Sequence, residues 1–218
     1  MPEHSTMSMM WMRMPGQTWA GVAQSFLAMW IVMTAAMMLP SLVPTLWRYR
    51  QAAREAGRRR DWLTTLVAGG YFFVWTLVGA TLFPFGVAIA AIEMRAPSLG
   101  HVVPMAGSVV IVIAGVLQLS AWKVRRLAFF SERHTVSARA AAAWRHGLSL
   151  GLHCAYSCAP LMAIVFVIGI MDIRAMAVAT LAITVERLPP SGARVARAIG
   201  GIGLAAGLFL IVRAVGHS

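Results

Sequence analysis

The chain has 218 residues, of which 59% are hydrophobic and 12% are charged, and its formal net charge is +12. A soluble domain of this length needs far less apolar sequence to build a core, so the composition excludes the soluble globular class and indicates a membrane protein. Apolar runs recur along the whole chain, and residues 1–17 lack the pattern of a cleaved signal peptide. We therefore expect a membrane protein and exclude a secreted soluble one.

The apolar runs predict an all-α fold, namely a polytopic transmembrane helix bundle of about six spans. A Met-rich tail (1–23) precedes a single helical domain (24–215), whose spans are expected at about 24–46, 63–92, 102–122, 146–170, 173–185 and 199–215. The fifth span is short, because about 13 residues rise only ~20 Å against a hydrocarbon core of ~30 Å. It would need Asp172 and Arg187 as interfacial ends, or a locally thinner bilayer.

Positive charge sets the expected orientation. Most of the 19 Lys and Arg residues fall in the loops between the first and second, third and fourth, and fifth and sixth spans. Positive loops stay in the cytoplasm, so both termini are predicted to be extracytoplasmic. The net charge is thus interpreted as a topology signal that also attracts anionic lipid, and nucleic-acid binding is not expected because no binding module or basic soluble face is visible.

The N-terminal tail begins MPEHSTMSMMWMRMPG. Its methionines are Met7, Met9, Met10, Met12 and Met14. Thioether sulfur is a soft, neutral ligand that suits Cu(I), so an outer tail of this kind could collect copper. The alternative is an amphipathic or disordered start in which Met is only a flexible apolar side chain.

The first span places three methionines at four-residue steps. Met29, Met33 and Met37 would stack on one helix face, about 6 Å apart in rise, with Met38 beside the last of them. This ladder could pass or hold a soft metal ion. Ordinary core packing uses Met at the same spacing, so a packing role is the alternative.

The fourth span carries both cysteines of the chain. Cys154, Cys158 and Met162 follow at four-residue steps, and His146 falls on roughly the same face two turns earlier. His153 points about 100° away. Such a stripe could bind Cu(I), with a third ligand from the Met ladder, although a Cys and His pair would also accept Zn(II). Small-residue packing is the alternative, and a disulfide between consecutive helical turns would have poor geometry.

Several motifs together resemble a known family. They are MWIVMTAAMMLPS, GYFFVW, RHGLSLGLHC, SCAPLM, GIMD and the pair ER, spread over about residues 30–188. They resemble the bacterial integral membrane proteins grouped as domain of unknown function 2182 (DUF2182), which are predicted to bind metal. The matching residues are Met33, Met37, Met38, Pro40, His146, Gly147, Cys154, Cys158, Met162, Met171 and Glu186.

The resemblance implies a multi-pass protein of the bacterial inner membrane that handles metal, and the ligand types favour copper. This chain departs from the family's pattern at Ser157 and Ala159, where relatives carry a second adjacent cysteine and a tryptophan. It also has Arg126 and Phe130 where relatives tend to carry a cysteine pair. These departures remove thiols that could hand metal over on the inner face.

Three residues are candidate accessory ligands besides His153. They are Met171, Asp172 and Glu186. The two acids could pair with neighbouring groups or carry a proton, or they could simply mark the membrane interface. Glycines of the last span, among them Gly200 and Gly207, suit close helix contact within the chain or in a homo-oligomer.

Three functions of different classes remain open at this stage. The favoured one is Cu(I) transport or membrane copper delivery, in exchange with a copper-handling periplasmic or membrane partner. A metal-dependent membrane enzyme would need a compact His or carboxylate centre, which the scattered histidines do not indicate, so no catalytic residue is expected. The third is an assembly or scaffold protein whose sulfur residues only pack. No nucleotide-binding motif supports ATP-driven pumping.

Overall fold

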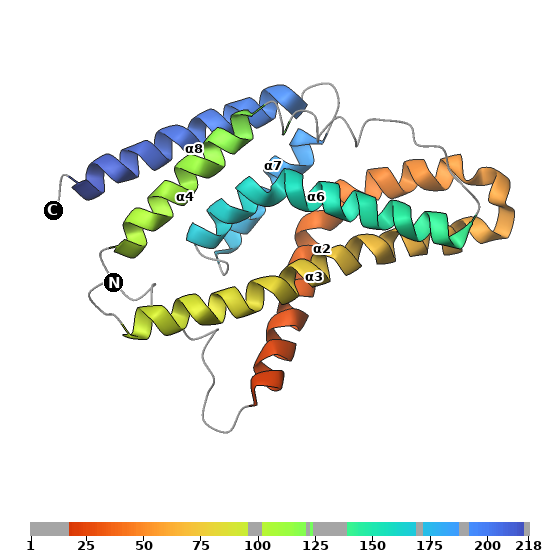
Figure 1. The fold of residues 1–218 in the computed structure, drawn as a ribbon. Helices are drawn as coiled ribbons and strands as arrows, with labels where there is room; N and C mark the ends of the chain where they lie inside the picture. The colour runs from red at the N-terminus through yellow and green to blue at the C-terminus, as the bar shows by residue number, and fades with distance from the viewer. Residues whose placement is uncertain are drawn as a thin grey trace.

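The computed structural model describes residues 18–95, 102–120, 123, 139–168, 172–187 and 192–215. Its elements are α2 (Trp19–Ala52), the short 3-10 segment η1 (Arg54–Arg59), α3 (Arg60–Arg95), α4 (Val102–Leu119), α6 (Ala140–Ile168), α7 (Ile173–Glu186) and α8 (Gly192–Val215). The six α-helices overlap the six expected spans in order, and no strand occurs in the described residues. The predicted all-α helical bundle is therefore confirmed (Figure 1).

Four stretches are long and apolar enough to cross a membrane. They are Trp19–Ala52, Gly57–Ile92, Ala140–Val167 and Arg194–Arg213. α4 contributes a shorter apolar stretch, Ala106–Leu119, and α7 has only 14 residues. The expected weakness of the fifth span thus corresponds to the shortest α-helix among the described residues.

Local signals explain where the helices begin and turn. The Thr18 hydroxyl caps α2 by accepting from the backbone N–H of Gly21 at 3.2 Å. Between α2 and α3 the chain passes through Gly57, whose φ of 56° is in the left-handed region that favours glycine. Arg50 and Asp61 then pair at 2.8 Å on the exposed side of this turn. The turn therefore sends α3 back along α2.

Tryptophan packing fixes α2 against α3. Trp30 is 1% exposed, and its indole N–H donates to the backbone oxygen of Trp75 at 2.8 Å. Phe26 lies one turn earlier and packs on Phe83, two turns after Trp75, so the two helices are antiparallel. Gly79 is required beneath Trp30, because a Cβ there would enter the space of the indole ring. The buried indole N–H is satisfied by this bond, as a buried donor should be.

Glycines allow α3 and α6 to approach closely. A Cβ on Gly147 would clash with the carbonyl oxygen of Val67, and one on Gly151 would lie 2.9 Å from the carbonyl oxygen of Tyr71. Since residue numbers rise together along both helices, α3 and α6 run parallel. The four-residue separation of the two glycines is the small-residue spacing of close helix contacts in membranes. This contact sets Tyr71 beside the middle of α6.

The pair α4 and α8 packs through a second set of glycines and runs antiparallel (Figure 1). A Cβ on Gly115 would lie 2.8 Å from the backbone nitrogen of Leu204, and one on Gly207 would lie 2.7 Å from the Val112 side chain. The glycines expected to favour helix contact in the last span thus do so within the chain.

Helix α7 is the element that brings polar groups inside the bundle. Its 14 residues rise about 21 Å, less than the ~30 Å thickness of a hydrocarbon core. It begins at the capping residue Asp172, which is exposed, and ends at Glu186, which is 4% exposed. The C-terminal end of α7 therefore reaches the interior and the middle of α6.

Candidate metal site

Three sulfur atoms meet in the core between α2 and α6. Cys154 and Cys158 are free thiols, 0% and 2% exposed, and their sulfur atoms lie 3.7 Å apart. The sulfur atom of Met38, also 0% exposed, lies 3.9 Å from that of Cys154. The four-residue spacing of the cysteines accounts for the first contact, because it places them on one face of α6.

These separations suit a shared soft ion. Two sulfur atoms that each lie about 2.3 Å from one ion are roughly 3.8 to 4.6 Å apart, as the angle at the ion opens from tetrahedral to linear. The observed sulfur separations of 3.7 and 3.9 Å lie at the tetrahedral end of that range. Thiolate and thioether ligands favour Cu(I), so the donor set fits the metal that the sequence predicts.

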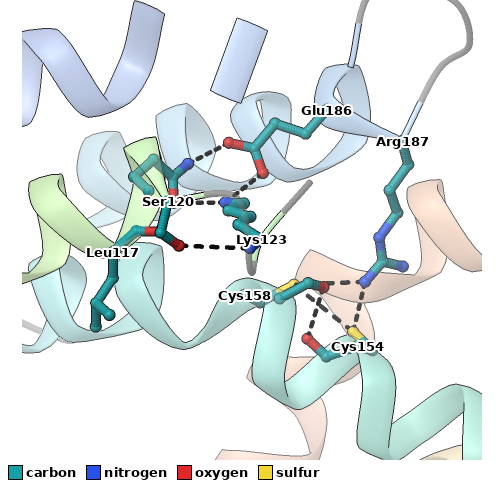
Figure 2. A network of polar contacts seen from close by, with 9 residues as sticks. Leu117, Ser120, Lys123, Cys154, Cys158, Glu186 and Arg187 are labelled. Carbon is teal, nitrogen blue, oxygen red and sulfur yellow. Dashed lines mark hydrogen bonds and ion pairs between the residues drawn. The ribbon is translucent and has the colours of Figure 1, made fainter. Parts of the chain in front are cut away.

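Two polar groups from other helices contact the same sulfur atoms. The Tyr71 hydroxyl lies 3.0 Å from the Cys154 sulfur. The Nη2 atom of Arg187 lies 2.6 Å from the Cys154 sulfur and 3.4 Å from that of Cys158, while Nη1 donates to the Ser41 hydroxyl at 2.9 Å. Figure 2 shows the Arg187 side chain reaching from the end of α7 to both cysteines. Four helices therefore meet at this cluster.

A buried ion pair lies beside it. Lys123, 0% exposed, pairs with Glu186 at 2.7 Å (Figure 2). The Gln118 side-chain amide forms hydrogen bonds with both of them. The backbone of Lys123 is held by a hydrogen bond to the Ser120 oxygen at 3.1 Å, just beyond α4. Burial lowers the pKa of Lys123, and the negative charge of Glu186 acts against that shift. The pair leaves neither charge uncompensated, which a buried ion requires.

The methionines of the predicted ladder lie in or against the same hydrophobic core as the cysteines, but the sulfur contact with Cys154 comes from another methionine. Met33, Met37 and Met162 are 8%, 2% and 7% exposed and belong to the core cluster that includes both cysteines. Met29 is only partly buried and packs against that cluster. The methionine with the sulfur contact is Met38, which sequence analysis placed beside the ladder. The ladder methionines thus share the core with the cysteines, and Met38 supplies the contact with Cys154.

The two histidines of α6 lie apart from the sulfur cluster. His146 stacks on Tyr49, with ring centroids 5.5 Å apart, and eight residues separate it from Cys154, a rise of ~12 Å. The Nδ1 atom of His153 lies 2.8 Å from the backbone oxygen of Ser149 on its own helix. His146 is therefore too far along α6 to share one ion with Cys154, because a metal–nitrogen bond is about 2 Å long.

The two acidic candidates have different roles. Asp172 caps α7 by accepting from the backbone N–H groups of Arg174 and Ala175 at 2.8 and 3.1 Å. This agrees with its interpretation as an end of the fifth span. Glu186 is 4% exposed and pairs with Lys123, which matches the alternative that it pairs with a neighbouring group. Arg187, expected as an interfacial end of the fifth span, lies partly buried with its guanidinium against the cysteines.

Some predicted ligands lie outside the described residues. They are Met171 and the tail methionines Met7, Met9, Met10, Met12 and Met14. Within the described ranges, no group of three or more His, Cys, Asp or Glu side chains could hold a metal ion. A site at Cys154 and Cys158 would hold an ion with two thiolates and the nearby Met38 thioether, a donor set that favours copper over zinc.

Sequence reasoning missed Arg187, Tyr71 and Ser41 as neighbours of the cysteines. A signal existed for Arg187, which follows Glu186 in the ER pair that carried the family resemblance. The Gly147 and Gly151 spacing was another, because it predicts the close helix contact that positions Tyr71. No pattern in the sequence singles out Ser41.

The comparisons with known proteins bear on copper directly. No curated protein and no solved structure matches the chain. A sequence model of the family PpoB2, described as copper chaperone, matches residues 27–210, which include every residue of the sulfur cluster. That match covers most of the 218 residues. The chain therefore belongs to the PpoB2 copper chaperone family.

Proposed function

We propose that this chain binds one Cu(I) ion inside the helix bundle, at Cys154 and Cys158 with the Met38 thioether, and delivers it within or across the membrane. The observation that carries the proposal is the meeting of three buried sulfur atoms from two helices, 3.7 and 3.9 Å apart. Membership of a copper chaperone family and the four apolar helices support it. The resemblance to DUF2182 agrees with it.

The chemistry of the site follows from its ligands. Cysteine binds metal as thiolate, so Cu(I) binding to both cysteines releases any proton that their sulfur atoms still carry. The ion keeps its charge and no electron is transferred. A site made only of sulfur, in a dry interior, favours a soft monovalent ion and gives hard ions such as Mg²⁺ no oxygen ligands. The site is thus suited to holding copper in its reduced form.

The methionine side chains suggest a direction from the outer face. With both termini outside, the Met-rich tail and the ladder of Met29, Met33 and Met37 would lie between the extracytoplasmic side and Cys154. Weak thioether ligands at successive steps could pass Cu(I) without trapping it. We infer a protein of the bacterial inner membrane that exchanges copper with a periplasmic or membrane protein, with His146 at a separate position nearer the cytoplasm.

The test is Cu(I) stoichiometry and affinity of the purified full-length protein, under reducing conditions, with a chromophoric Cu(I) chelator as competitor. The variant Cys154→Ser with Cys158→Ser is expected to lose about one tight equivalent. Met38→Leu, which keeps the volume but removes the sulfur, is expected to weaken that equivalent. Met29→Leu is the matched control on the same helix, because its side chain has no such sulfur contact.

Each result decides between the functions that the sequence left open. If one equivalent survives the double cysteine change, the core is not the copper site. If binding then disappears on deleting residues 1–17, copper is collected only by the tail. Absence of tight Cu(I) binding in the wild type would favour the scaffold, in which the thiols only pack. Tighter binding of Zn(II) than of Cu(I) would contradict the assignment of the metal.

A further inference from the structure

Arg187 is the described cation nearest to the paired sulfur atoms. Its Nη2 atom lies 2.6 and 3.4 Å from the two sulfur atoms, and its Nη1 atom is anchored on Ser41 of α2. A guanidinium stays protonated under all ordinary conditions, so this positive charge does not depend on pH. The side chain is directed at the cysteines from the end of α7 (Figure 2). Any ion bound by the thiolates would therefore share the site with a fixed positive charge.

The charges nearby divide into two groups. Lys123 and Glu186 form an ion pair at 2.7 Å, so their charges cancel each other. Arg187 and the two thiolates of a metal-bound site form the other group. Two thiolates with one monovalent ion carry a net charge of minus one, which Arg187 neutralises. With a divalent ion, the two thiolates are already neutral, and Arg187 would leave one positive charge uncompensated.

An uncompensated charge is expensive at this depth. Both cysteines are at most 2% exposed, so water does not screen the site. Burying an ion without a partner is strongly unfavourable, whereas a neutral set of charges with hydrogen bonds is tolerated. The same three groups thus favour a monovalent ion and disfavour a divalent one, independently of the softness of the ligands.

We propose that Arg187 is the residue that selects monovalent over divalent soft cations at the Cys154 and Cys158 site. The inference rests on the proposed copper site and adds the reason for its selectivity. Arg187 acts as a counter-charge and hydrogen-bond donor to the thiolates and is not itself a metal ligand, since guanidinium has no acceptor atom. Removal of its charge should leave a site with the same two sulfur ligands and a weaker preference for monovalent ions.

The experiment measures the binding of Ag(I) and Cd(II) to the full-length protein, each in competition with a chelator of known affinity. Ag(I) is a monovalent soft probe that is not reoxidised, and Cd(II) is a divalent ion that favours thiolate. Arg187→Met removes the charge and keeps a long apolar stem. Its Ag(I)-to-Cd(II) affinity ratio is expected to fall by at least about 30-fold, as for the loss of one partner of a buried charge pair.

Two further variants separate charge from structure. Arg187→Lys keeps the positive charge and should keep the preference for Ag(I), although the bond to Ser41 is lost. Arg174→Met removes an exposed arginine from the same helix and should leave the ratio unchanged. A variant that only loosened the fold would lower the affinities for Ag(I) and Cd(II) by similar factors. The ratio in Arg187→Met, with its recovery in Arg187→Lys, therefore reports the charge.

The proposal is overturned by an unchanged ratio in Arg187→Met. If that variant does not fold, the wild type still decides, because a site with this counter-charge must bind Ag(I) more tightly than Cd(II). Equal or tighter Cd(II) binding in the wild type would therefore also overturn it. Failure of the copper site itself looks different, since Ag(I) binding would then survive the double change of Cys154 and Cys158 to Ser.

Discussion

The two halves of the bundle are packed in different ways. Helices α2, α3, α6 and α7 enclose large aromatic, sulfur and charged side chains, with Trp30, Tyr71 and Cys154 all at most 1% exposed. The pair α4 and α8 packs through small residues, with Gly115 against Leu204 and Gly207 against Val112. Large apolar side chains point outward in both parts, for example Ile202 at 71% and Val178 at 67% exposed. The difference therefore lies in the interiors, because the described contacts to the Cys154 sulfur come from α2, α3, α6 and the end of α7.

The halves meet at the buried ion pair. Gln118 and Lys123 come from the end of α4 and the residues after it, and Glu186 comes from the end of α7. Since Arg187 follows Glu186 directly, the pair fixes the position of the side chain that contacts the cysteines. The α4 and α8 pair is therefore expected to support the site through Glu186, without supplying a metal ligand.

The largest expected effect is a loss of stability when the ion pair of Lys123 and Glu186 is broken. Glu186→Gln leaves Lys123 charged and unpaired in the interior, and should lower the free energy of unfolding by about 3–5 kcal/mol. Lys123→Met alone should cost a similar amount. The double variant should be less destabilised than the sum of the two, because no lone charge then remains. Equilibrium unfolding in mixed micelles, titrated with denaturing detergent, measures all three.

The control for this cycle is the exposed pair of Arg50 and Asp61, whose carboxylate side chain is 64% exposed. Asp61→Asn should change the free energy of unfolding far less, because water screens both charges. Equal losses at the two pairs would contradict the view that the ion pair at Glu186 is buried and holds α7 in place. Copper stoichiometry of the Lys123→Met, Glu186→Gln double variant should remain near one, since all three sulfur ligands are retained.

A smaller loss of stability is expected from alanine at the two glycine contacts, Gly147 between α3 and α6 and Gly207 between α4 and α8. Gly147→Ala places a Cβ against the Val67 carbonyl oxygen and forces α3 away from α6, at a cost of about 1–3 kcal/mol. Gly207→Ala should cost a similar amount by meeting Val112. The two should differ in Cu(I) affinity, which falls in Gly147→Ala, where the contact that sets Tyr71 beside Cys154 is lost, and is kept in Gly207→Ala.

Gly201→Ala is the matched control on α8, because nothing lies within 4 Å of the Cβ it adds. It should not destabilise the protein, since alanine is the better helix former. A loss of Cu(I) affinity in Gly207→Ala equal to that in Gly147→Ala would show that the α4 and α8 pair takes part in the site directly.

The helices and the cysteine stripe were predictable because each is a local pattern. Long apolar runs and a four-residue spacing are properties of one segment, so six helices and the neighbouring positions of Cys154 and Cys158 followed from the sequence. The choice of Met38 as the contacting thioether did not. It depends on how α2 is rotated against α6, where Trp30 of α2 packs on Phe166 of α6 with ring centroids 6.0 Å apart.

The polar surroundings of the site were not predictable for a related reason. Arg187 lies 33 positions from Cys154, and Ser41 lies 146 positions from Arg187. Loops rich in Arg favour an interfacial interpretation, because most Arg residues next to a span remain in water. Only the short length of α7 indicates that its C-terminal end could stop inside the bundle, and length alone does not show which neighbour it meets.

The smallest effect concerns Asp172, the accessory candidate at the other end of α7. In the structure its carboxylate accepts from two backbone N–H groups, at 2.8 and 3.1 Å, and so acts as a helix cap. Asp172→Ala should lower the free energy of unfolding by about 1 kcal/mol, and Asp172→Asn by less, because asparagine caps nearly as well. Neither should change the affinity for Cu(I), since a carboxylate is a hard ligand and the cap uses it fully. Measured in the same micelles as the glycine variants, the alanine change would separate the two ends of α7. If Asp172→Ala lowered the affinity for Cu(I) as well as the stability, the exposed end of α7 would also supply a metal ligand. If it lowered the stability alone, the metal ligands would lie only near the buried end of α7, beside Cys154.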